Sequence, residues 1–221
     1  SFTARFYDAF QNLPKDYYDY MVIDEVHHLA ADSYRKLFEH FSPQLLIGLT
    51  ATPERMDGVS LLPDFNHQIS AEIRLPLALD EGLLTPFQYL CISDQTDLTS
   101  DNLMQGNKYK ATKLSEKLCT KERAVLIYDR LKYYLPNEEK CKALGFCATK
   151  EHARFMAQHF NELGLKADYL TSDRNDVRDE LNKKLAQGCI NYLFVVDIFN
   201  EGVDIPEIDT VLFLRPSESL T

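Results

Sequence analysis

The chain has 221 residues, of which 45% are hydrophobic and 26% are charged, and its formal net charge is -10 at pH 7. This composition is typical of a globular protein with enough apolar residues for one large domain or two small ones. It contains no run of about 18 apolar residues, which excludes a membrane-spanning helix. The acidic balance argues against binding of nucleic acid through global charge, and it leaves room for a local basic cleft.

Five cysteines are scattered along the chain, odd in number and never in C-x-x-C spacing. This usage predicts neither a disulfide framework nor a zinc ribbon. A reducing cytoplasm fits it best. Because the chain begins with Ser1 and has no signal-peptide pattern, we expect it to be part of a longer cytoplasmic protein.

Short apolar runs alternate with helical patterns along the chain. The runs that predict strands are 20–23, 45–49, 88–92, 143–147, 192–196 and 210–214. The patterns that predict helices are 34–41, 113–135, 150–163 and a segment that starts at Asp173 and stops before Gly188. Alternation of this kind predicts an α/β fold with parallel sheets and right-handed crossovers.

The first predicted strand ends in two adjacent acids, Asp24 and Glu25. In doubly wound sheets, ligands bind outside the C-terminal ends of the strands, where such acids are solvated and can face a metal-bound phosphate. One acid could then hold Mg²⁺ through water while its neighbour orients the attacking water. The alternative is a solvated strand-to-loop junction without chemistry, and the isolated motif fits both.

A second metal hypothesis rests on the E-x-x-H spacing of Glu25 and His28. Di-iron carboxylate proteins use this spacing on bundle helices, but they need two such pairs. No other histidine has a glutamate three residues before it, and H-E-x-x-H does not occur. We therefore reject a di-iron or zinc hydrolase.

Four segments resemble, in order, the motifs of superfamily 2 helicases and translocases, in particular the DExH branch that includes the motor subunits of restriction enzymes. They are DEVH at 24–27, LLIGLTATPERMDG at 45–58, LGFCATKEHARFMAQHF at 144–160 and FVVDIFNEGVDIPEIDTVLFLRP at 194–216. The resemblance implies a parallel-sheet, RecA-like architecture, with a partial first domain plus most of a second. Residues 1–86 would be the C-terminal part of the first domain. Residues 87–221 would be the second domain, ending before its last motif.

The resemblance also implies ATP and Mg²⁺ as cofactors. Asp24 would bind magnesium through water and Glu25 would activate the attacking water. His27 would be the third catalytic residue and would sense the nucleotide. The family pattern ends at His27, so the neighbouring His28 receives no role.

Further residues carry over by the same resemblance. Thr50, Ala51 and Thr52 would couple ATP turnover to movement on nucleic acid, since hydroxyls and an imidazole can re-pair when the γ-phosphate leaves. Gly202 and Asp204 would bind ATP. 

Thr149 has two interpretations of equal weight. By the resemblance it would contact nucleic acid, and by its position before the predicted helix 150–163 it could be an N-cap without further function.

Two parts of such an NTPase are missing from the chain. None of the eight glycines is followed by lysine, so the phosphate-binding G-x-x-x-x-G-K-[ST] loop is absent. No glycine precedes an arginine, so the final Q-x-x-G-R-x-x-R motif with its arginine finger is absent too. We therefore expect the chain to be inactive as an ATPase by itself.

The expected function of the parent is ATP-dependent movement on nucleic acid, with DNA favoured over RNA because the TATPERMDG and FNEGVDIP segments look most like DNA-directed motors. No membrane partner is expected, and accessory domains or subunits would lie outside this chain. The alternative is a degenerate, non-catalytic helicase-like module that serves as a nucleic-acid or protein-binding scaffold.

Overall fold

The chain divides into two compact units, which we call unit 1 (up to Tyr89) and unit 2 (from Leu90). The computed structural model describes residues 10–30, 32–51, 60–94, 96, 98, 104–105, 108–196 and 205–216. The division falls three residues after the boundary expected from the sequence. The assignment of the two units to a first and a second RecA-like domain stays a prediction.

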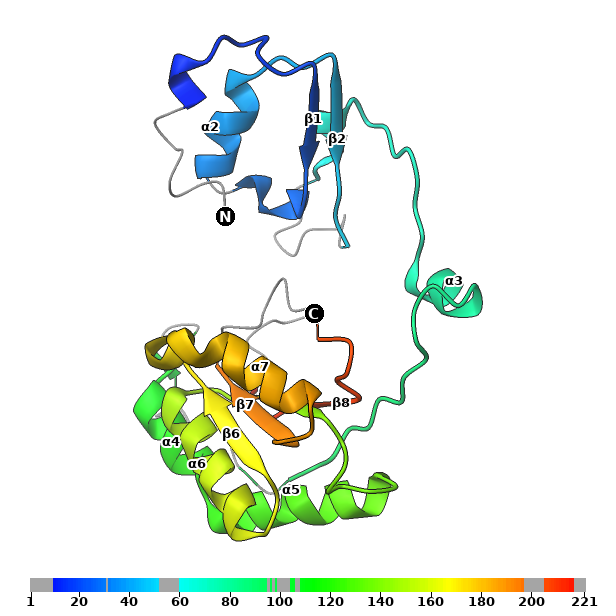
Figure 1. Cartoon of the computed structure of the whole chain (residues 1–221). Helices are drawn as coiled ribbons and strands as arrows, with labels where there is room; N and C mark the ends of the chain where they lie inside the picture. Colours follow the sequence, from blue (N-terminus) through cyan, green and yellow to red (C-terminus); the bar gives the residue numbers. More distant parts are fainter. Residues whose placement is uncertain are drawn as a thin grey trace. The chain divides into compact units, whose positions relative to one another are not determined.

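Unit 1 is built around a two-stranded parallel sheet (Figure 1). Strand β1 (Tyr20–Ile23) pairs with β2 (Leu45–Gly48), and helix α2 (Asp32–His40) lies between them in the chain. The other described elements are the 3-10 helices η1 (Phe10–Asn12), η2 (Val26–Ala30) and η3 (Leu62–Phe65) and the short helix α3 (Leu75–Asp80).

The core of unit 1 lies on one face of this sheet. Ile23 of β1 packs there with Val26 and Leu29 of η2, and Phe38 of α2 covers the same cluster. Side chains alternate across a strand, so the other face carries the neighbouring residues. These are exposed: Tyr20, Val22, Leu45 and Ile47.

Unit 2 contains a four-stranded parallel sheet in the order β6-β7-β5-β8. Its strands are β5 (Ala143–Phe146), β6 (Ala167–Leu170), β7 (Tyr192–Val195) and β8 (Thr210–Phe213). All three pairings are parallel. The parallel-sheet α/β fold expected from the sequence is therefore confirmed.

Helices cover both faces of the unit 2 sheet (Figure 1). Helices α5 (Lys121–Tyr134) and α6 (Lys150–Glu162) bury side chains against one face, and α7 (Arg178–Ala186) packs on the other. The remaining described elements of this unit are α4 (Ala111–Leu118), the 3-10 helix η4 (Ser172–Val177) and a small hairpin of β3 (Met104–Gln105) and β4 (Lys108–Tyr109). None of the helices in the described ranges has the length and apolarity needed to cross a membrane.

Five of the six predicted strands are confirmed, and the one predicted at 88–92 is wrong. This segment forms no strand, and its apolar side chains, such as Tyr89 at 76% exposure, pack against no sheet. Conversely, β6 was not predicted. It has only four residues and an aspartate, Asp168, in its middle, which hides the apolar pattern.

The single helical stretch predicted at 113–135 is wrong, because the chain forms α4 and α5 with a break between them. Thr120 lies at this break in an extended conformation, and its Oγ1 accepts a hydrogen bond from the backbone N of Arg123 at 3.3 Å. Such a side-chain cap starts a new helix.

The predicted glycine stops are confirmed. Gly164 and Gly188 follow α6 and α7 with φ angles of 89° and 74°, a region that favours glycine. The predicted helix start at Asp173 is wrong. The turn of η4 comes first, and α7 begins only at Arg178, without a side-chain cap.

Candidate functional site

The two predicted acids lie in the turn after β1, at the C-terminal edge of the unit 1 sheet. The Oδ1 of Asp24 accepts a hydrogen bond from the backbone N of Glu25 at 2.9 Å. Beyond the strand ends, the N–H of Leu49 donates to Ile23 O (2.8 Å) and the N–H of Val26 donates to Leu49 O (2.9 Å). These two bonds keep the turn beside the segment that leaves β2.

The turn itself is strained at Glu25, whose φ of 49° lies in the left-handed region. For a residue with a side chain this conformation costs on the order of 1–3 kcal/mol and is retained where the surroundings demand it. Here it lets the chain turn from β1 into η2. As a result, His27 Nδ1 lies 3.4 Å from Glu25 Oε2.

His27 also joins the two predicted motifs of unit 1. Its Nδ1 lies 3.0 Å from the Oγ1 of Thr50, which is 23 residues away in the chain. A histidine N–H at this position has two acceptors in reach, the hydroxyl of Thr50 and the carboxylate of Glu25. The His27 N–H can therefore switch its hydrogen bond from one acceptor to the other when the charge near Glu25 changes. Ala51 follows and is exposed, whereas Thr52 lies outside the described residues.

Asp24 and Glu25 fit a magnesium ion whose coordination is completed by other groups. Asp24 is exposed and the Glu25 side chain is 46% exposed, so both carboxylates can reach a ligand in solvent. Mg²⁺ usually keeps several waters and takes one or two carboxylates plus substrate phosphates. In the described parts of the chain, no group of three or more His, Cys, Asp or Glu side chains could hold a metal by itself.

Thr149 is the N-cap of α6. Its Oγ1 accepts a hydrogen bond from the backbone N of His152 at 3.1 Å. The same oxygen lies 2.6 Å from the Oγ of Ser115, a buried residue of α4. The capping interpretation is thus seen directly, and the contact to nucleic acid stays a prediction. The predicted ATP-binding residues Gly202 and Asp204 lie outside the described residues.

Sequence reasoning missed a buried polar cluster in unit 2. The guanidinium of Arg123, whose side chain is 11% exposed, donates from Nε to Asp94 Oδ2 at 2.9 Å. Burial raises the pKa of Asp94, but hydrogen bonds from Thr96 and from Arg123 outweigh burial and leave this pKa below its ordinary value. No local pattern marks these residues, because 29 positions separate Asp94 from Arg123.

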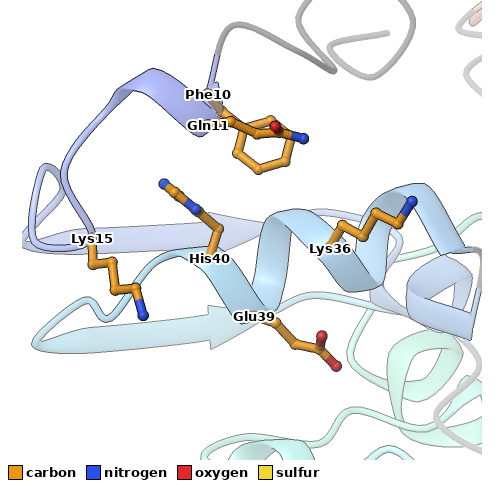
Figure 2. A pocket seen from close by; sticks show the side chains of 6 residues that line it. All are labelled: Phe10, Gln11, Lys15, Lys36, Glu39 and His40. Atoms are coloured by element: carbon orange, nitrogen blue, oxygen red, sulfur yellow. The ribbon is translucent and has the colours of Figure 1, made fainter.

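A hollow of about 390 Å³ lies in unit 1, away from the predicted site (Figure 2). It is lined by Phe10, Gln11, Lys15, Lys36, Glu39 and His40. These residues precede β1 or belong to the second half of α2, which leads back to the start of β2, whereas the acids follow the end of β1. The His40 ring is fixed there by the carbonyl of Leu13, 2.9 Å from Nε2.

Comparison with protein families gives two matches. Residues 2–55 match the family described as type III restriction enzyme, res subunit, and residues 126–221 match the helicase conserved C-terminal domain. Together these two stretches contain all four motif segments except the last three residues of the second, which ends at residue 58.

Curated relatives match nearly the whole chain. A putative ATP-dependent helicase IRC3 of Saccharomyces cerevisiae is 32% identical over 209 residues, which are 90% of this chain and 30% of that protein. The type I restriction enzyme EcoAI endonuclease subunit of Escherichia coli is 26% identical over 96% of this chain and 29% of that protein. UvrABC system protein B of Campylobacter fetus is 26% identical over 89% of this chain and 29% of its own length. The chain thus spans about a third of these relatives.

Among solved structures, Saccharomyces cerevisiae Dbp5 bound to RNA and ADP BeF3 is 14% identical, with a TM-score of 0.44, over 90% of this chain and 45% of that chain. The Pyrococcus furiosus Hef helicase domain is 22% identical, with a TM-score of 0.37, over 47% of this chain and 20% of that chain. The family matches and the curated relatives, together with the order of the motifs, confirm the resemblance found in the sequence: the chain is similar to the superfamily 2 helicases, including the motor subunits of restriction enzymes.

Proposed function

We propose that the parent of this chain is an ATP-dependent helicase or translocase that couples ATP hydrolysis to movement on nucleic acid. In this proposal Asp24 binds Mg²⁺ through water, Glu25 activates the attacking water and His27 senses the nucleotide. The magnesium ion, when bound, neutralises phosphate charge. The protein groups around it orient water and move a proton at the Glu25 carboxylate.

One observation carries the proposal: the 3.0 Å contact between His27 Nδ1 and Thr50 Oγ1. A solvated strand end without chemistry does not require an imidazole that contacts both a carboxylate and a threonine just after the next strand. A site that couples ATP turnover to movement does require it, because the imidazole can change its hydrogen-bond partner from Glu25 to Thr50 or back. Thr50, Ala51 and Thr52 would then couple this change of partner to movement on nucleic acid.

The remaining roles follow the same proposal. Gly202 and Asp204 would bind ATP, and Thr149 would contact a nucleic-acid phosphate. DNA is favoured over RNA because of the likeness to DNA-directed motors, and the restriction-enzyme names among the matches support this preference. A cytoplasmic location is part of the proposal and rests on the unpaired cysteines.

A second candidate is a non-catalytic scaffold that binds nucleic acid or protein. It is favoured by the lack of any Gly-Lys or Gly-Arg pair in the 221 residues. Both candidates expect the chain by itself to show no ATP turnover. Measurable nucleic-acid-stimulated ATPase from the 221-residue chain would contradict this expectation and the scaffold, while the helicase proposal for the parent would stand.

The test that separates them uses the intact parent protein. We expect nucleic-acid-stimulated ATP turnover, and we expect Glu25→Gln to lower it by about 10²- to 10⁴-fold because a general base is lost without a change of size. Glu81→Gln, at an exposed glutamate that follows α3, is the matched control and should leave turnover unchanged. Absence of turnover in the parent would favour the scaffold. Turnover that Glu25→Gln leaves intact would contradict the role of Glu25.

A further inference from the structure

The Arg123 guanidinium binds three segments of unit 2 that are far apart in the chain. Its Nε donates to Asp94 Oδ2 (2.9 Å), its Nη2 donates to the carbonyl of Leu214 (3.2 Å), and its Nη1 lies 3.3 Å from His152 Nε2. Asp94 is the fifth residue of unit 2, Leu214 directly follows β8, and His152 lies in the first turn of α6. Arg123 therefore ties the start of unit 2 to the C-terminal edge of its sheet.

The planar fork of arginine explains why one side chain can do this. A guanidinium presents its N–H donors in fixed directions, whereas a lysine ammonium is a compact charge on a flexible stem. Asp94 is itself held, because its Oδ1 accepts from the backbone N of Thr96 at 2.9 Å. The ion pair is largely shielded from solvent, with side-chain exposures of 11% for Arg123 and 28% for Asp94. In such a setting each partner depends on the other for its charge to be satisfied.

The same cluster reaches Thr149 through His152. The His152 backbone N donates to Thr149 Oγ1, and its ring Nδ1 lies 3.4 Å from the backbone N of Ala148. On the other side, Ser115 Oγ lies 2.6 Å from Thr149 Oγ1. The loop of Ala148 and Thr149 is thus held by α4 through Ser115 and by α6 through His152, which Arg123 of α5 contacts in turn.

We propose that Arg123 is a positioning residue, which fixes the start of unit 2 against the Thr149 loop and thereby sets the geometry of the nucleic-acid contact. This inference rests on the proposed function, because that function makes Thr149 a phosphate contact. Arg123 does not itself touch the nucleic acid, since its side chain is only 11% exposed and its donors face Asp94, Leu214 and His152. Its effect on binding is exerted through the placement of the loop.

The first test asks, in the absence of nucleic acid, whether Arg123 holds the segments that it contacts. Hydrogen exchange of the 221-residue chain is compared between wild type, Arg123→Lys and the control Arg130→Lys, an exposed arginine on the same helix. We expect Arg123→Lys to speed exchange in the segments 90–98 and 147–153, with α7 unchanged. Arg130→Lys should match wild type. Uniform acceleration across unit 2, or no change in either segment, would overturn the proposed tie.

The second test measures binding of a fluorescein-labelled single-stranded DNA oligonucleotide at several salt concentrations. We expect Arg123→Lys to weaken binding by roughly three- to tenfold, as for residues that act through packed neighbours. The slope of log K against log salt should stay the same, because no phosphate contact is lost. Loss of a direct phosphate contact would instead reduce the slope by about 0.7.

The two tests fail in distinguishable ways. If the wild-type chain binds no oligonucleotide, both the nucleic-acid function of this chain and the positioning role are contradicted, while the exchange data still show whether Arg123 holds the loop. If the wild type binds and Arg123→Lys binds equally well, or binds with a smaller salt slope, the positioning role is contradicted and the proposed function stands.

Discussion

The buried histidine of unit 2 should make this unit sensitive to mild acid. His152 has no exposed surface, and both of its ring nitrogens face N–H donors, from Arg123 at Nε2 and from the backbone of Ala148 at Nδ1. A neutral imidazole has one acceptor and can satisfy only one of these donors, and the protonated ring has none. Burial, followed by the charge of Arg123, lowers the pKa of His152 to about 3.

The sign and size of the effect follow from the difference between the folded and unfolded pKa. In the unfolded chain a histidine titrates near 6.5, so below this pH the unfolded state binds a proton that the folded state does not. Stability from His152 is therefore complete above pH 6.5 and is lost as the pH falls toward 3. At pH 5, which is about 1.5 units below 6.5, the loss is about 2 kcal/mol at roughly 1.4 kcal/mol per unit.

The assay is urea unfolding at pH 8, 6 and 5, followed by NMR cross-peaks of β5 and β7 so that unit 2 is observed by itself. His152→Gln removes the titrating group and keeps an acceptor for Arg123, and we expect this variant to lose about 2 kcal/mol less than wild type between pH 8 and pH 5. His67→Gln, at an exposed histidine of unit 1, should retain the wild-type dependence. Asp94 has a lowered pKa and contributes only at more acidic pH. Equal pH dependence in wild type and His152→Gln would refute the reasoning.

Three further predictions concern single contacts. Gly145→Ala should destabilise unit 2 by about 1–3 kcal/mol in urea unfolding, because the added Cβ would lie 2.5 Å from the ring of Phe194; an unchanged midpoint would mean that the ring moves freely. Thr120→Ala should cost about 1 kcal/mol by the same measurement, since α5 loses its side-chain cap; a loss below about 0.3 kcal/mol would show that the 3.3 Å bond contributes little. A double-mutant cycle of His27→Ala and Thr50→Val, measured by unfolding of unit 1, should give a coupling of about 1 kcal/mol, and additive effects would argue against the contact.

The sequence was sufficient where structure depends on local pattern. The strands at β1 and β7 are continuous apolar runs with branched or aromatic residues, and the glycine stops at Gly164 and Gly188 require a backbone that few other residues adopt. The link between His27 and Thr50 was implied by the resemblance to helicases, and the two side chains lie 3.0 Å apart in the structure. For the strands and the glycine stops, a few neighbouring residues determine the result.

The sequence was insufficient where structure depends on distant partners. The segment 88–92 has the composition of a strand, but a strand also needs a neighbour with free hydrogen-bonding groups, and composition does not report this. The predicted helix 113–135 was interrupted by one hydroxyl, that of Thr120, whose effect depends on the conformation of the chain before it. Strand β6 is short and contains an aspartate, and it forms because β7 lies beside it and pairs with it.

The Arg123 cluster shows the same limit at the level of function. Its members, Asp94, Arg123, His152 and the carbonyl of Leu214, come from four segments spread over about half of the chain. Each residue taken alone reads as a surface polar group of a helix or loop. Only the fold brings them together. Burial then changes the energetics of the ion pair: a solvent-exposed pair contributes little to stability, whereas a shielded arginine destabilises the fold if its partner is removed. Residues that position a site are therefore hidden from motif analysis even when the residues of the site itself are found.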